Sequence, residues 1–219
     1  QKGGDQTRLG TIESLSAEFN LIAAFRGRAS FHEFHLVRPH LLLTRESSGM
    51  IDWTNEGLLA KAIAGADEKS GEEVLLKELD AEIGTITVED GTPDVPDVAS
   101  GRTYRFDGVT ADISWPRLSN PISAVLIART NGLDLKLDFA SRSPLLIFGG
   151  RSAPLKASLT SNLLTARFDG LANIAHLFDL SGVMALGIPD LPALLTWSGR
   201  SLPGIPTLKA FSLEGDITS

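Results

Sequence analysis

Gly132-Leu-Asp-Leu-Lys-Leu-Asp-Phe-Ala140 is the stretch that decides the fold. Its leucines and Phe139 occupy odd positions, and its charged residues occupy even positions. Because successive side chains of a strand point to opposite faces, this pattern predicts a strand with one apolar face and one polar face. A helix would scatter the same residues around its circumference. The pair Asn131-Gly132 is a strong hairpin signal, and it predicts that strands 122–130 and 133–140 pair with each other.

The same alternation of apolar and polar residues recurs along much of the chain. It is clearest at 84–91, 104–115, 155–159, 163–169 and 208–218, with a Pro/Asp loop at 92–101. The chain therefore predicts a mainly β fold, built on a long, mostly antiparallel sheet with one apolar face. Helical spacing occurs in three short segments at 58–63, 171–178 and 191–198, the last with Asp190 as its cap, while 12–25 and 71–82 fit either a helix or a strand. We expect 145–148 to be a short buried strand or a wall segment.

Composition excludes several classes of protein. Of 219 residues, 42% are hydrophobic, which excludes a disordered chain, and the absence of Cys excludes disulfides and thiolate metal sites. The net charge of −7 argues against nucleic-acid binding, because phosphate contacts need a basic face. Residues 67–97 hold eleven acidic residues and two lysines, and we expect them to form a solvated sheet edge that resists pairing. Residues 1–10 are polar, and we expect them to be disordered.

No motif in the sequence predicts catalysis, a metal or a cofactor. His32 and His35 are three residues apart in a segment that reads as a strand, so they should point to opposite faces and not share a metal ion. The chain has no Gly-x-Ser-x-Gly elbow, phosphate-binding loop or dinucleotide fingerprint. Asp134 and Asp138 fall on the polar side of a predicted strand, which explains them without chemistry. We therefore expect a non-enzymatic protein.

The predicted apolar face remains the candidate site, and two interpretations of it stay open. Helices or a second layer could cover it, in which case the face is an ordinary core. Alternatively the face could be a groove for an apolar ligand, since a large exposed apolar surface usually marks an interaction site. The short helical segments are not obviously enough to cover so many strands.

Several runs in a fixed order resemble the AsmA family of bacterial envelope proteins. The C-terminal runs are Leu163-Leu-Thr-Ala-Arg-Phe-Asp-Gly170, Leu180-Ser-Gly-Val-Met-Ala-Leu186, Pro189-Asp-Leu-Pro-Ala-Leu-Leu-Thr-Trp-Ser-Gly199, Leu202-Pro203 and Phe211-Ser-Leu-Glu-Gly215. Upstream, Phe34-His-Leu-Val-Arg-Pro-His40, Ile51-Asp-Trp53 and Gly84-Thr-Ile-Thr-Val-Glu-Asp90 are similar to further family segments. The resemblance covers the chain from about residue 31 to its end.

The resemblance implies a single AsmA-like periplasmic domain over 1–219, from which an N-terminal helix that anchors such proteins in the inner membrane is missing. It implies a curved sheet whose apolar inner face carries phospholipid acyl chains between the inner and outer membranes, in support of outer-membrane biogenesis. The alternative is a non-lipid assembly factor whose apolar face or sheet edge contacts outer-membrane protein precursors. The residues predicted to line the groove are Ile113, Trp115, Leu133, Leu135, Leu137, Phe139, Leu159, Phe168, Leu213 and Ile217.

Overall fold

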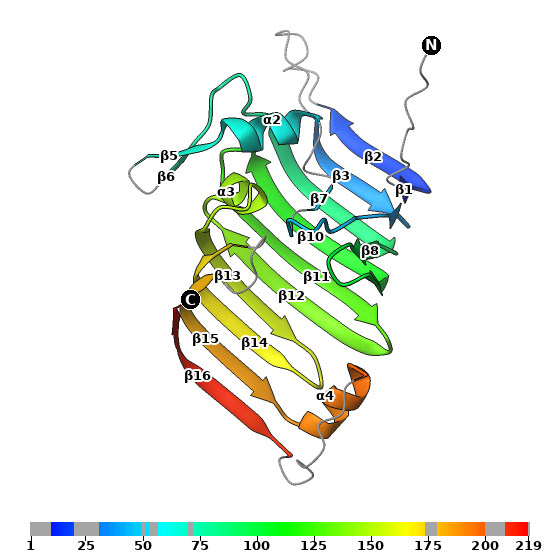
Figure 1. Ribbon diagram of the computed structural model, residues 1–219. Coiled ribbons are helices and arrows are strands. Elements are labelled where there is room, and N and C mark those ends of the chain that lie inside the picture. The colour runs from blue at the N-terminus through cyan, green and yellow to red at the C-terminus, as the bar shows by residue number, and fades with distance from the viewer. Residues whose placement is uncertain are drawn as a thin grey trace.

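A computed structural model describes residues 10–19, 31–49, 51–52, 57–69, 72–173, 179–199 and 209–218. Its centre is one ten-stranded sheet, ordered β16-β15-β14-β13-β12-β11-β10-β7-β3-β2, in which only β3 and β7 pair in parallel (Figure 1). The strands are β2 (Ser14–Phe19), β3 (Phe31–Val37), β7 (Glu82–Gly91), β10 (Asp107–Arg117), β11 (Ile122–Thr130), β12 (Leu133–Ser141), β13 (Ala153–Thr160), β14 (Thr165–Ala172), β15 (Leu180–Ile188) and β16 (Phe211–Thr218). The mainly β, mostly antiparallel prediction is confirmed.

The hairpin between β11 and β12 forms where the sequence predicts it. Thr130 pairs with Leu133, and eight further residue pairs follow without a shift. Asn131 and Gly132 have φ values of 47° and 76°. Two successive positive φ values belong to a turn whose twist matches that of the flanking strands, and Asn-Gly adopts it readily.

Three two-stranded ribbons lie outside the large sheet: β1 (Gly10–Thr11) with β4 (His40–Leu41), β5 (Asp67–Lys69) with β6 (Glu72–Val74), and β8 (Asp94–Asp97) with β9 (Arg102–Arg105). The prediction of one strand over 104–115 was wrong, because Phe106 separates β9 from β10. The predicted loop at 92–101 contains β8. The sequence predicts that residues 1–10 are disordered, but residues 1–9 lie outside the described residues. Gly10 is described, and it pairs with Leu41 in a short ribbon.

The acidic run does not form a sheet edge, so that prediction was wrong. β7 lies inside the sheet between β3 and β10. Its charges are accommodated because Glu82 and Glu89 are exposed towards the two ends of the strand, while Ile86 and Val88 between them are half-buried. Arg117 of β10 binds the Asp80 carboxylate at 2.9 Å and that of Glu82 at 2.7 Å.

Three short helices accompany the sheet in the described part of the chain: α2 (Gly57–Gly65), α3 (Pro144–Phe148) and α4 (Leu191–Trp197). α2 and α4 match predicted helices, and Asp190 caps α4 by accepting a hydrogen bond from the Ala193 N–H at 2.9 Å. α3 was predicted as a strand or wall segment. It is a helix that Pro144 opens and Gly149 follows, both favourable at those positions. Of the helix predicted over 171–178, the first two residues belong to β14, and 174–178 lie outside the described residues.

A compact core forms where α2 and α3 pack on one end of the strands. Ala62 of α2, Leu145 of α3 and Trp115 of β10 are all buried in it. The rings of Trp115 and Phe148 meet edge to face with centroids 5.7 Å apart. Figure 1 shows α2 and α3 near one end of the strands and α4 at the opposite end. Among the described residues, no helix is both long and apolar enough to cross a bilayer.

Candidate functional site

The strand register assigns each residue of the large sheet to one of its two faces. Directly paired residues project to the same side, and successive residues of a strand project to opposite sides. We call face A the side that carries Leu137, and face B the side that carries Asp138. All ten residues predicted to line a groove share face A. The sequence therefore identified one side of the sheet, although it could not show how the strands would be ordered.

One row of paired residues crosses the whole of face A. Every member is Leu, Val or Ala, and each of the ten strands contributes one residue. This leucine row consists of Leu15, Leu36, Val88, Ala111, Leu126, Leu137, Leu159, Ala166, Leu186 and Leu213. No charged or hydrogen-bonding side chain interrupts it.

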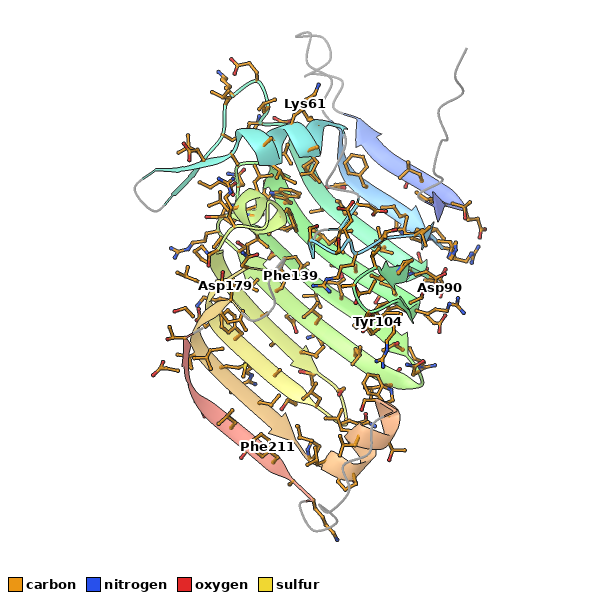
Figure 2. The ribbon with its side chains drawn as sticks, in the orientation of Figure 1. Lys61, Asp90, Tyr104, Phe139, Asp179 and Phe211 are labelled. Atoms are coloured by element: carbon orange, nitrogen blue, oxygen red, sulfur yellow. The ribbon has the colours of Figure 1, made fainter. Side chains whose placement is uncertain are left out.

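A second row on face A lies beside the first and contains the aromatic rings. This phenylalanine row consists of Phe34, Ile86, Ile113, Ala124, Phe139, Ala157, Phe168, Met184 and Gly215. Phe139 is flanked by two alanines, which leave room for its ring, and Figure 2 places it near the middle of the sheet. Large and small residues thus alternate from strand to strand along part of this row.

The ten predicted residues differ in how far the protein covers them. Trp115 and Leu133 are 5% and 4% exposed, and Ile113 and Phe139 pack against the core beneath α2 and α3. These four side chains therefore contribute to the packing of the protein interior and are not fully available to a ligand. The residues Leu135, Leu137, Leu159, Phe168 and Ile217 are half-buried, and Leu213 is 49% exposed on the edge strand. The more accessible of the ten residues therefore lie on β12 to β16, and Leu15 of the leucine row is also 60% exposed on β2 at the other edge.

Face B has a different composition at the same positions along the strands. Its central row, the mixed row, consists of Ser16, His35, Thr87, Asp112, Val125, Asp138, Ser158, Arg167, Ala185 and Glu214. Charges on this face pair with one another, either across two strands or along a single strand. Lys156 lies 2.7 Å from Asp169, and Lys136 lies 3.4 Å from Asp138. Face B therefore carries more charged and polar side chains than face A, although Val125, Ile127, Leu171 and Val183 are also exposed on it.

A hollow of about 960 Å³ lies over face B. Eight neighbouring members of the mixed row border it, from Thr87 to Glu214, together with Lys156 and Asp169. Two exposed aliphatic side chains, Val125 and Val183, also border it. Sequence reasoning missed this hollow, since the alternation classed these residues only as a solvated surface. Its position depends on the shape of the assembled sheet, for which the sequence carries no local signal.

Two carboxylates outside the rows have shifted pKa values. Burial raises the pKa of Glu73, although its Oε2 accepts a hydrogen bond from the Leu146 N–H at 3.1 Å in the first turn of α3. Burial would also raise the pKa of Asp80, but hydrogen bonds from Arg117 and Ser119 outweigh it and lower that pKa. Glu73 thus links β6 to α3, and Asp80 links the segment before β7 to the end of β10. The described ranges contain no group of three or more His, Asp or Glu side chains placed to hold a metal ion.

No protein-family model, curated protein or solved structure matches the chain. The resemblance to the AsmA family therefore rests on the sequence motifs alone, and the function must be argued from the two faces of the sheet.

Proposed function

We propose that face A is an open apolar surface that binds phospholipid acyl chains, on a non-enzymatic AsmA-like periplasmic protein. The leucine row is the observation that carries this proposal. Ordinary cores need apolar residues only where another layer covers them. Here the aliphatic row continues over β13 to β16, beyond the part of the sheet that α2 and α3 cover.

The dimensions of the row suit an acyl chain. Strands lie about 4.8 Å apart, so a row across ten strands extends for roughly 43 Å. An acyl chain spans half of a hydrocarbon layer that is about 30 Å thick. One chain would therefore occupy only part of the row, and could move along it without meeting a polar side chain.

Each step of such movement is nearly neutral in free energy. Shielding a methylene group from water is worth about 0.8 kcal/mol, so a bound chain of a dozen or more methylenes gains enough to stay on the protein. Since the row offers Leu, Val or Ala at every strand, no position holds the chain much more tightly than its neighbour. This supports carriage between two membranes better than storage at one site.

The cellular role in this proposal comes from the AsmA resemblance. We infer that the protein acts in the periplasm, is anchored to the inner membrane in its full-length form, and supports outer-membrane biogenesis by moving phospholipid to the outer membrane. The AsmA resemblance also implies a curved sheet with an apolar inner side, whereas the hollow in this structure lies over face B.

Two matched variants of the protein purified from cells test the proposal. Leu159→Asp places a charge in the leucine row, while Ser158→Asp places the same charge one residue away on face B. Native mass spectrometry followed by organic extraction should find phospholipid on the wild type and on Ser158→Asp, and little on Leu159→Asp. Circular dichroism would confirm that both variants fold. Lipid-free wild type that also fails to take up added fluorescent lipid would overturn the proposal and favour the assembly-factor alternative.

A further inference from the structure

The edge strand β16 is built to accept another strand. It pairs with β15 through eight successive residues without a bulge, and it contains no Pro or Lys. Bulges, Pro and Lys commonly block pairing at a sheet edge, as charged side chains do in general, so the acids Glu214 and Asp216 restrict this edge to a partner of opposite charge. Among the described residues, no segment other than β15 hydrogen-bonds the β16 backbone. Every second residue of an antiparallel edge strand therefore directs its N–H and C=O groups away from the sheet.

The opposite edge of the sheet, β2, is less suited to pairing with an added strand. β2 has six residues, and its pairing with β3 shifts register between Ala17 and Glu18. A bulge of that kind twists an edge and interrupts the spacing of its free backbone groups. The long regular edge is therefore at β16 (Figure 1).

The side chains of β16 define what a partner strand must carry. Glu214 and Asp216 are exposed on face B, and no ion pair joins either to the described part of the chain. Between them on face A lies Gly215, where an added Cβ would meet nothing within 4 Å. Leu213 and Ile217 flank that glycine on the same face. A partner strand would therefore meet two acidic side chains on face B. On face A it would meet two aliphatic side chains with an unfilled space between them, beside Gly215.

A second copy of the chain matches this edge less well than a basic segment does. A two-fold axis perpendicular to the sheet keeps face A of both copies on one side, and it pairs residues whose numbers have a constant sum. Centring that pairing on Gly215 sets Glu214 opposite Asp216 twice, and centring it on Glu214 or Asp216 sets that acid opposite its own copy. Like charges directly opposite each other destabilise a strand pair. Centring it on Leu213 avoids these contacts, but it sets Glu214 opposite Ser212 and Asp216 opposite Ala210, so neither acid gains a basic partner.

We propose that β16 binds an extended segment of a partner protein by strand addition, and that this segment carries two basic residues flanking one large apolar residue. The basic residues lie opposite Glu214 and Asp216. The large residue, best an aromatic one, fills the space beside Gly215, as aromatic side chains do for glycines on neighbouring strands. Apolar residues at the outer positions extend the rows of face A. The inference depends on the edge and not on lipid binding, so either can fail alone.

Fluorescence anisotropy with two labelled peptides tests the inference. The basic probe is Thr-Val-Lys-Phe-Lys-Leu-Thr, and the matched acidic probe has Glu in place of both Lys. We expect the basic probe to bind the wild-type chain roughly fivefold to 30-fold more tightly, because exposed opposite-charge pairs contribute up to about 1 kcal/mol each. The double variant Glu214→Lys with Asp216→Lys should reverse the preference.

A charge-matched variant separates strand addition from general attraction. The interior variant Asp112→Lys with Glu78→Lys makes the same change in net charge, on the interior strand β10 and in the turn before β7. We expect this variant to keep the preference for the basic probe, and amide exchange in β16 to slow when that probe binds. Equal affinity for both probes, reversal by the interior variant, or β16 protection that appears instead with self-association would each overturn the inference.

Discussion

Leu137 and Asp138 are neighbours in β12, yet they belong to different surfaces of the sheet. Leu137 lies between Leu126 and Leu159 in the leucine row, whereas Asp138 lies between Val125 and Ser158 in the mixed row. This relationship holds at each step along the strand, because the side-chain period of a strand is two residues. The two faces can therefore be tested separately with adjacent substitutions.

The first prediction compares these two neighbours. Leu137→Ala should lower the free energy of unfolding by about 1–2 kcal/mol, less than a fully buried leucine loses because Leu137 is half-buried. Asp138→Ala should change it by less than about 0.5 kcal/mol, since its partner Lys136 is exposed. Urea unfolding measures both values. A larger loss for Asp138→Ala than for Leu137→Ala would contradict the assignment of the faces.

The alternation of residues made this part of the structure predictable, and other parts show why prediction fails. Residues 145–148 are apolar without a period, so a buried strand and a short helix look alike, and the structure has the helix α3. The parallel pairing of β3 with β7 joins segments about fifty residues apart and has no local signal. The same is true of the hollow over face B, which needs eight strands in order.

The second prediction concerns the turn between β11 and β12. Gly132 has a φ of 76°, which side chains adopt at a cost, so Gly132→Ala should destabilise the protein by about 1 kcal/mol. Gly215→Ala is the matched control, because both sites have free space and Gly215 has no positive φ. Thermal unfolding should show a lower melting temperature for the Gly132 variant alone. Equal effects would mean that the turn conformation is not what selects glycine.

The third prediction concerns the close approach of β14 and β15. Gly170 pairs directly with Gly182, and a Cβ on Gly170 would lie 2.2 Å from the Ser181 carbonyl oxygen. That contact is with backbone and cannot be relieved by a rotamer change. Gly170→Ala should therefore cost about 3 kcal/mol in urea unfolding, near the upper range for overpacking. A cost below that of Gly132→Ala would show that the two strands can separate easily.

The fourth prediction follows from Glu73, whose pKa burial raises above its ordinary value of 4.5. The native protein binds this proton more tightly than the unfolded chain, so stability is highest when Glu73 is protonated and declines as pH rises through the raised pKa. Glu73→Gln removes the titration. The free energy of unfolding of the wild type, minus that of the variant, should fall as pH increases from 4.5 towards neutrality. A difference that rises over this interval would contradict the buried position of Glu73.

The central claim is that acyl chains lie on face A, and site-specific photo-crosslinking tests it most directly. A p-benzoyl-phenylalanine side chain would replace Leu159 on face A or Ser158 on face B, and the protein would be irradiated in cells. Mass spectrometry of the purified adducts should find phospholipid attached at position 159 and not at position 158. Equal crosslinking at the two positions, or crosslinking at 158 alone, would contradict the account.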